Sequence, residues 1–206
     1  MKIELDKQYG PALVNYLRQC TMTSVPVVKP IAFAVGTNSN VLETSDSVIE
    51  DMTTFIHNVM CSNYYLVDTT GTLDKPILFE MTVSTNLKTS DFNSVKVYSK
   101  EDSVLLHALS ETPVKIYFRN ACGKYSVKQN LQFLQDAGVN TNDIVVVPSR
   151  HCAVDSFTVN EIENEDKFVC EIDVKSQIAS KDNIYKYALE KVQEGITELS
   201  KLLSNS

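Results

Sequence analysis

The middle of the chain, residues 94–149, alternates short apolar runs with segments whose apolar residues recur at helical spacing. Strands are expected around Val97, at 114–118 and at 144–147, with a helix in each interval. The last run, Ile144-Val145-Val146-Val147, is apolar without a break, which is typical of a parallel strand covered on both faces. This pattern predicts a central parallel βαβαβ unit with right-handed crossovers, in which 144–147 is an inner strand.

Local signals support the two helices of this unit. The first is expected to carry Val104, Leu105, Ala108 and Leu109. The second begins with capping-box spacing over Ser126-Val127-Lys128-Gln129 and ends before Gly138.

The N-terminal part of the chain mixes both kinds of element. A helix is expected over 9–20, an extended segment over 25–36, and a second helix after the capping-box spacing at 47–50. Strands are expected at 64–68 and 77–84. The fold class is therefore α/β to α+β with a mixed sheet. One domain over 1–206 is expected, with a subdivision into 1–88 (α+β) and 89–206 (α/β) as the alternative.

The C-terminal part predicts a β-hairpin, 152–159 with 167–175, followed by a long amphipathic helix over about 181–203. One stripe of this helix holds Ile184, Ala188, Val192, Ile196, Leu199 and Leu203. We expect Ile184, Ala188, Val192, Ile196 and Leu199 to dock the helix on its own sheet or on a neighbouring subunit.

Composition limits the classes of function. Of the 206 residues, 43% are hydrophobic and 22% charged, which is typical of a folded globular protein. The net charge of −7 makes nucleic acid an unlikely partner, because phosphate-binding surfaces are basic. No targeting segment or membrane span is recognised, and the five scattered cysteines predict free thiols. A cytoplasmic protein is expected, in the host-cell cytoplasm or the virion if the protein is viral.

The strand expected at 168–175 carries charges on one face. Side chains alternate along a strand, so Glu171, Asp173 and Lys175 share the face opposite an apolar one. Two carboxylates and an amine in this order can hold a divalent metal beside a phosphate. They can equally form the solvated side of an amphipathic strand, which is the interpretation that we favour.

Together with Asp155 on the preceding strand, the triplet Asp173-Val174-Lys175 resembles the PD-(D/E)-x-K signature of restriction-endonuclease-like nucleases. The resemblance covers about the last third of the chain. It implies Asp155 and Asp173 as metal ligands, Glu171 as an auxiliary acid and Lys175 as the catalytic amine. The sequence departs from the family in three respects. No proline precedes Asp155, and no strand follows the C-terminal helix. Asp155 would also share a strand face with Ala153 and Phe157, which are expected in the core.

Other motifs carry no complete chemistry. His57 and His107 are each expected within a helix, without an acid or thiol at metal-ligand spacing. His151 and Cys152 are adjacent in an extended segment, where neighbouring side chains point apart. Gly123-Lys124 lacks the rest of a phosphate-binding loop, so no cofactor is expected.

The leading hypothesis is a non-enzymatic interaction or assembly subunit of an oligomeric complex, such as a phage or virus structural protein. Its expected partners are other proteins or further copies of itself. The alternative is a metal-dependent nuclease of the PD-(D/E)-x-K class.

Overall fold

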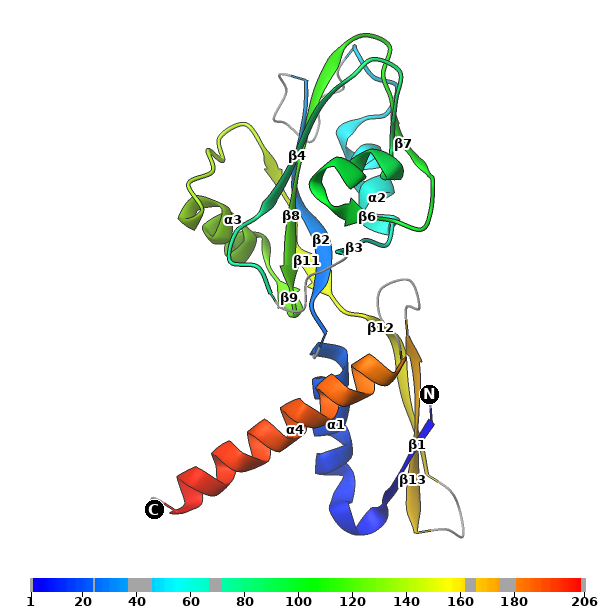
Figure 1. Cartoon of the computed structure of the whole chain (residues 1–206), viewed down its shortest axis with the longest axis vertical. Helices are drawn as coiled ribbons and strands as arrows, with labels where there is room; N and C mark the ends of the chain where they lie inside the picture. The colour runs from blue at the N-terminus through cyan, green and yellow to red at the C-terminus, as the bar shows by residue number, and fades with distance from the viewer. Residues whose placement is uncertain are drawn as a thin grey trace. The chain divides into compact units, whose positions relative to one another are not determined.

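The computed structural model describes residues 2–23, 25–36, 46–66, 72–161, 166–174 and 181–204 (Figure 1). By their contacts these residues form two compact units. Unit 1 is Met1–Pro26 with Cys152–Ser206, and unit 2 is Val27–His151. The alternative boundary after residue 88 lies inside unit 2, whereas the expectation of one domain stays a prediction.

Unit 2 is built on a four-stranded antiparallel sheet. In pairing order its strands are β10 (Val145–Val146), β2 (Val27–Val35), β8 (Thr112–Ala121) and β4 (Ile77–Val83). Every strand pair described in either unit is antiparallel, so the fold is α+β.

The predicted parallel βαβαβ unit is wrong. β10 pairs antiparallel with β2 at the edge of the sheet, although it lies in the unbroken apolar run. The reason is that both faces of the sheet are covered there. Val145 and Val147 belong to one apolar cluster, whereas Ile144 and Val146 pack on the other.

Helices and loops cover the two faces of this sheet (Figure 1). On one face, α2 (Met52–Cys61) packs over a core rich in aromatic rings, in which Phe33 meets Phe55 edge to face. On the other face, α3 (Val127–Asp136) buries Leu134 against Ile31 of β2.

The ends of these helices test the capping predictions. The predicted capping box of α3 is confirmed, because Ser126 Oγ accepts the Gln129 N–H and Gln129 Oε1 accepts the Ser126 N–H. α2 instead begins after Asp51, whose carboxylate accepts the Thr54 N–H over 2.6 Å. The predicted start at residues 47–50 is therefore wrong.

The predicted helix at Val104–Leu109 is wrong as well. The segment forms strand β7 (Val104–His107), which pairs antiparallel with β5 (Asn86–Lys88). Leu105 and Leu106, which are adjacent, are both buried in the aromatic-rich core. The pairing partner is distant in sequence, so the local spacing of apolar residues could not reveal it.

The shorter elements of unit 2 are β3 (Tyr65–Leu66), β6 (Val97–Tyr98), β9 (Gly123–Tyr125), β11 (Ser149–His151) and the 3₁₀ helix η2 (Thr89–Val95).

Unit 1 joins the two ends of the chain. Its antiparallel sheet has the order β1 (Lys2–Asp6), β13 (Lys167–Val174) and β12 (Val154–Glu161). The predicted hairpin is thus confirmed, while β1 is an addition that the sequence analysis missed. The helices are η1 (Lys7–Tyr9), α1 (Gly10–Thr23) and α4 (Lys181–Ser204), and the last two confirm the predicted terminal helices.

Candidate functional site

In unit 1, α4 packs against α1 along a stripe of small residues. Ala188 is fully buried, and Gly195 lies two turns further along the same side of α4. A Cβ added at Gly195 would lie only 1.9 Å from Tyr16 Oη of α1. The absence of a side chain at Gly195 therefore makes room for the Tyr16 ring, and this stripe is the α1-facing side of α4.

The Tyr16 phenol lies in an acidic surrounding. Burial raises its pKa above the ordinary value of 10.0, and the nearby Cys20 thiol raises it further. Glu194 and Glu198 of α4 act in the same direction, because their negative charge disfavours a phenolate. Tyr16 is therefore a neutral contact residue and is unsuited to act as a base at neutral pH.

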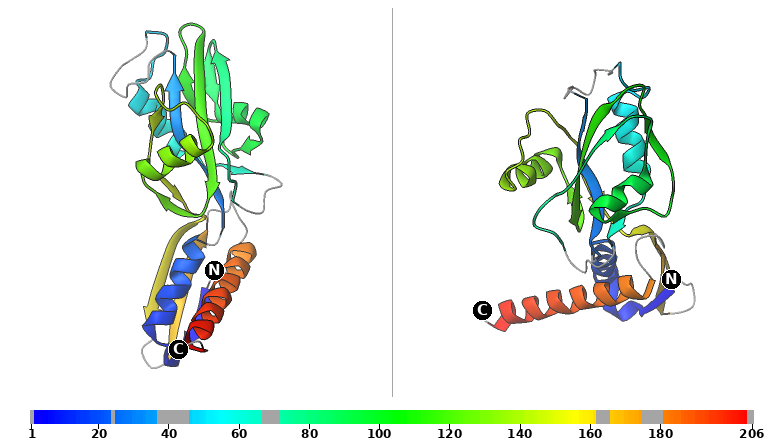
Figure 2. Two further views of the ribbon diagram at one scale, coloured as in Figure 1. Left: turned by 90° about the vertical axis from the view of Figure 1, so that its left-hand side faces the viewer. Right: turned by 45° about the horizontal axis from the view of Figure 1, so that its top comes forward.

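A second stripe of α4 is apolar and exposed. Leu189 is 44% exposed and Ile196 54% exposed, while Val192 between them is half-buried. Beyond Gly195, every described side chain up to Lys201 is exposed to solvent. Figure 2 shows this end of α4 extending past α1. Leu189 and Ile196 of α4 are thus apolar residues that the described part of unit 1 leaves uncovered.

The predicted docking stripe of α4 is split between these two sides. Ala188 faces α1, Val192 is half-buried, and Ile196 is exposed. The side chains of Ile184 and Leu199 lie outside the described residues. The role of these five residues in association stays a prediction.

The charged face of β13 is exposed, as expected for either interpretation of it. Glu171 and Asp173 both point to solvent, and Asp173 accepts a hydrogen bond from Ser156 Oγ over 2.8 Å. Asp155 is exposed at an irregularity of the β12–β13 ladder, where the register shifts between Val154 and Ser156. Lys175 lies outside the described residues.

Among the residues that the structure describes, no group of three or more His, Cys, Asp or Glu side chains could hold a metal ion. Asp155 and Asp173 accordingly belong to no such group. The nuclease alternative gains no supporting observation from this geometry.

His151 is a buried member of a polar network in unit 2. Its Nδ1 lies 2.6 Å from the Val27 carbonyl oxygen, which can only accept, so Nδ1 donates. The unprotonated Nε2 therefore accepts from Ser149 Oγ over 2.8 Å. Ser149 Oγ in turn accepts from Asn130 Nδ2, which also donates to the Val147 carbonyl.

This network resembles a serine–histidine pair in its contacts, but it is a structural one. Ser149 and His151 are both buried, and burial lowers the pKa of His151 to about 4. Asn130 Oδ1 accepts from Arg119, whose guanidinium lies over the Tyr125 ring. The network ties β11 to β2 and α3, and a substrate would have no access to the serine.

The other two histidines have contacts that the sequence analysis missed. On α2, Cys61 Sγ lies 3.5 Å from His57 Nε2, and their separation of four residues on a helix could have revealed this pair. His107 lies on strand β7 rather than on a helix, and its backbone N–H donates to Glu50 Oε2 over 2.7 Å. That contact spans distant parts of the chain and leaves no local signal.

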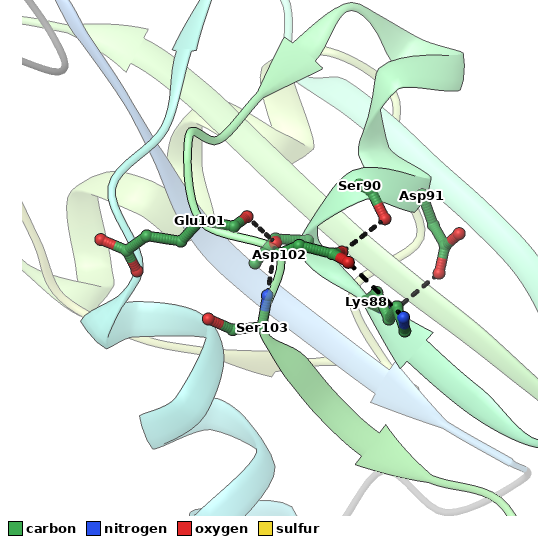
Figure 3. Close-up of polar contacts among 7 residues, drawn as sticks. Lys88, Ser90, Asp91, Glu101, Asp102 and Ser103 are labelled. Atoms are coloured by element: carbon green, nitrogen blue, oxygen red, sulfur yellow. Dashed lines mark hydrogen bonds and ion pairs between the residues drawn. The ribbon is translucent and has the colours of Figure 1, made fainter.

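A further polar cluster holds η2 to the segment before β7 (Figure 3). Ser90 Oγ donates to Asp102 Oδ1 over 2.9 Å, and Lys88 Nζ lies 3.5 Å from Asp102 Oδ2. The Lys88 N–H donates to Asp91 Oδ2. Both aspartates thus have partners within the cluster. The cluster therefore serves to hold η2 and the segment before β7 together.

The exposed apolar stripe of α4 is therefore a feature of unit 1 that the contacts within the described chain do not explain. None of the helices described here is both long and apolar enough to cross a membrane. Compared with protein-family models and with curated proteins, the sequence of this chain matches none of them.

Proposed function

We propose that this chain is a non-enzymatic subunit of an oligomeric assembly, and that α4 pairs with α4 of a second copy. The observation that carries this proposal is the exposure of Leu189 and Ile196 on a helix whose adjacent stripe, Ala188 and Gly195, already packs on α1. A helix with two apolar stripes is suited to two partners, and α1 accounts for one of them.

The spacing of the exposed stripe favours a second helix as its partner. Leu189, Val192, Ile196, Leu199 and Leu203 are separated by three and four residues in alternation. This is the a/d spacing with which two helices pack side by side over several turns. A second copy of α4 offers the same stripe, so one surface can serve both subunits.

The charges of α4 are compatible with this pairing. In the a/d frame, Glu190, Lys191, Glu194, Glu198 and Lys201 fall at positions away from the seam. In this frame Lys181 and Lys186 fall at g and e positions before Leu189, whereas the e and g positions between Leu189 and Leu203 carry no charge. Two copies would therefore meet without a row of like charges between them.

Packing energy supports the proposal as well. Most of the stability of a protein helix comes from burial of an apolar face, because isolated helices are marginal in water. Full burial of a residue such as Leu189 or Ile196 contributes about 1.5–3 kcal/mol. A partner helix would supply this burial energy to the exposed stripe of α4.

An assembly subunit of this kind suits a structural component of a large particle, such as a phage or virus. The chain is acidic, with a net charge of −7, and contains only six glycines. These properties are compatible with a virion or host-cell cytoplasmic location, which we include in the proposal.

Light scattering of the purified full chain tests the pairing. The native chain should have a mass that is a multiple of 23.0 kDa. Ile196→Asp should reduce it to 23.0 kDa, because a carboxylate would have to be buried in the seam. Thr197→Asp, which adds the same charge at the next exposed position, is the matched control and should keep the native mass. A native chain that stays at 23.0 kDa at every concentration would contradict the proposal.

A further inference from the structure

Strand β4 of unit 2 has a free edge. It is the last strand in its sheet and pairs only with β8, in a regular register from Ile77↔Phe118 to Val83↔Thr112. In the part of the chain that the structure describes, no strand pairs with its other side. Edge strands are often protected by charged side chains, proline or a bulge. Between Ile77 and Val83, β4 has no proline and no bulge, and its one charged side chain, Glu80, is paired with Lys115 of β8. The outer backbone groups of β4 are therefore available to a further strand.

Apolar side chains flank this edge on both faces of the sheet. Phe79 and Val83 point into the aromatic-rich core, and by strand alternation Met81 shares their face. Even so, Met81 is 41% exposed, and Leu78 on the opposite face is 40% exposed. An added strand would therefore find an apolar contact on each of its two sides.

On the Leu78 face, a groove of about 800 Å³ adjoins the edge. Its floor is formed by side chains of the sheet, among them Leu78 and Tyr117, and one wall by the segment 137–144 that follows α3. On this face α3 buries Leu134 against Ile31 and Tyr117, and the groove is lined by β4 and by the segment that follows α3.

The groove is lined by two positive charges and one negative charge, from Lys75, Lys115 and Asp143. Lys115 is paired with Glu80 over 2.8 Å, and this contact raises the pKa of Lys115. Lys75 is exposed and, among the described residues, has no hydrogen bond or ion pair. In a chain with a net charge of −7, the end of β4 that begins at Ile77 thus offers a cation to a ligand.

We propose that the edge of β4 and this groove bind an extended segment of a partner protein by strand addition. The segment carries an apolar side chain over Leu78 and a carboxylate that pairs with Lys75. Backbone hydrogen bonds to the edge supply affinity, and the side chains that alternate into the groove supply selectivity.

A second copy of β4 is a poor occupant of the same edge. Symmetric antiparallel pairing about the middle of β4 would place the two Glu80 side chains directly opposite each other. Like charges at opposite positions destabilise a strand pair. The proposal concerns unit 2 alone and does not depend on pairing of α4.

Short synthetic peptides test the proposal on the full chain. The probe is a fluorescently labelled peptide in which valine alternates with threonine and a glutamate stands at each end. Its matched control carries lysine at both ends. Fluorescence anisotropy should show binding of the glutamate peptide, with the lysine peptide about tenfold weaker. A glutamate peptide with N-methylated backbone amides should not bind, because it cannot extend the sheet.

Variants of the chain locate the binding. Lys75→Glu should reverse the preference between the two peptides, and Leu78→Lys should weaken binding of both. Leu109→Lys changes a leucine that is 65% exposed and does not line the groove, so it should leave binding unchanged. Circular dichroism melts should show that all three variants fold.

Three results would overturn the proposal. The native chain could fail to bind the glutamate peptide, or binding could be the same in Lys75→Glu and Leu78→Lys as in the native chain. Leu78→Lys could also lower the native mass in light scattering, which would make a second copy the occupant of the edge. Ile196→Asp should retain peptide binding, which separates a failure at β4 from a failure of the α4 proposal.

Discussion

At the scale of single residues, His151 makes the stability of unit 2 depend on pH. Its ordinary pKa is 6.5, and burial lowers it to about 4 in the folded protein. Below pH 6.5 the unfolded chain therefore binds a proton that the folded chain does not bind. The free energy of unfolding should fall as the pH decreases from about 6.5 towards 4.

The expected size of this effect follows from the two pKa values. Between pH 8 and pH 5, His151 should account for about 2 kcal/mol of lost stability. Urea unfolding of the native chain and of His151→Gln at both pH values measures it, because glutamine does not titrate. The pH dependence should be weaker in His151→Gln than in the native chain. Equal pH dependence in the two proteins would contradict the prediction.

At the scale of elements, the packing of α4 on α1 depends on Gly195. A glycine inside a helix normally costs about 1 kcal/mol relative to alanine. Here the alanine Cβ would lie 1.9 Å from Tyr16 Oη, so the ring would have to move away. Gly195→Ala should therefore fail to stabilise the native chain.

A double-mutant cycle checks this prediction. In a Tyr16→Ala background the obstacle is removed, and Gly195→Ala should then stabilise the chain by about 0.5–1 kcal/mol. Chemical denaturation of the four proteins measures the difference. The same gain in both backgrounds would show that Tyr16 does not contact this side of α4.

At the scale of the whole molecule, unit 2 is continuous in sequence and unit 1 is not. The first and last residues of unit 2 are tied together, because His151 Nδ1 donates to the Val27 carbonyl oxygen over 2.6 Å. Unit 2 also has its own buried core. The chain thus enters and leaves unit 2 at neighbouring points.

This arrangement predicts that residues 27–151 fold by themselves. The isolated segment should show cooperative thermal unfolding by circular dichroism and a dispersed amide spectrum by NMR. His151→Ala in the same segment should lower its melting temperature, since the variant removes the bond between the two ends. A segment that is unfolded in buffer would show that unit 2 needs unit 1 for its stability.

The elements predicted correctly are those with a local signal. The helices α1, α3 and α4 repeat their apolar residues at helical spacing, and the hairpin of β12 and β13 alternates with a period of two. Such patterns depend on residues a few positions apart, so the sequence displays them directly. The sequence analysis also placed an apolar stripe on this long helix, but the stripe did not include Leu189, and its role in association stays a prediction.

By itself, then, the sequence determined the position of these helices and strands and the amphipathic character of α4. Only the tertiary structure decided the direction of strand pairing, the strand β7 in place of a helix, and the union of β1 with β13. It also decided which stripe of α4 meets α1 and that β4 lies at an edge. The physical reason is that an apolar run can be buried as a helix or as a strand of either direction. Strand pairing and sheet edges, in contrast, depend on contacts between residues far apart in the chain.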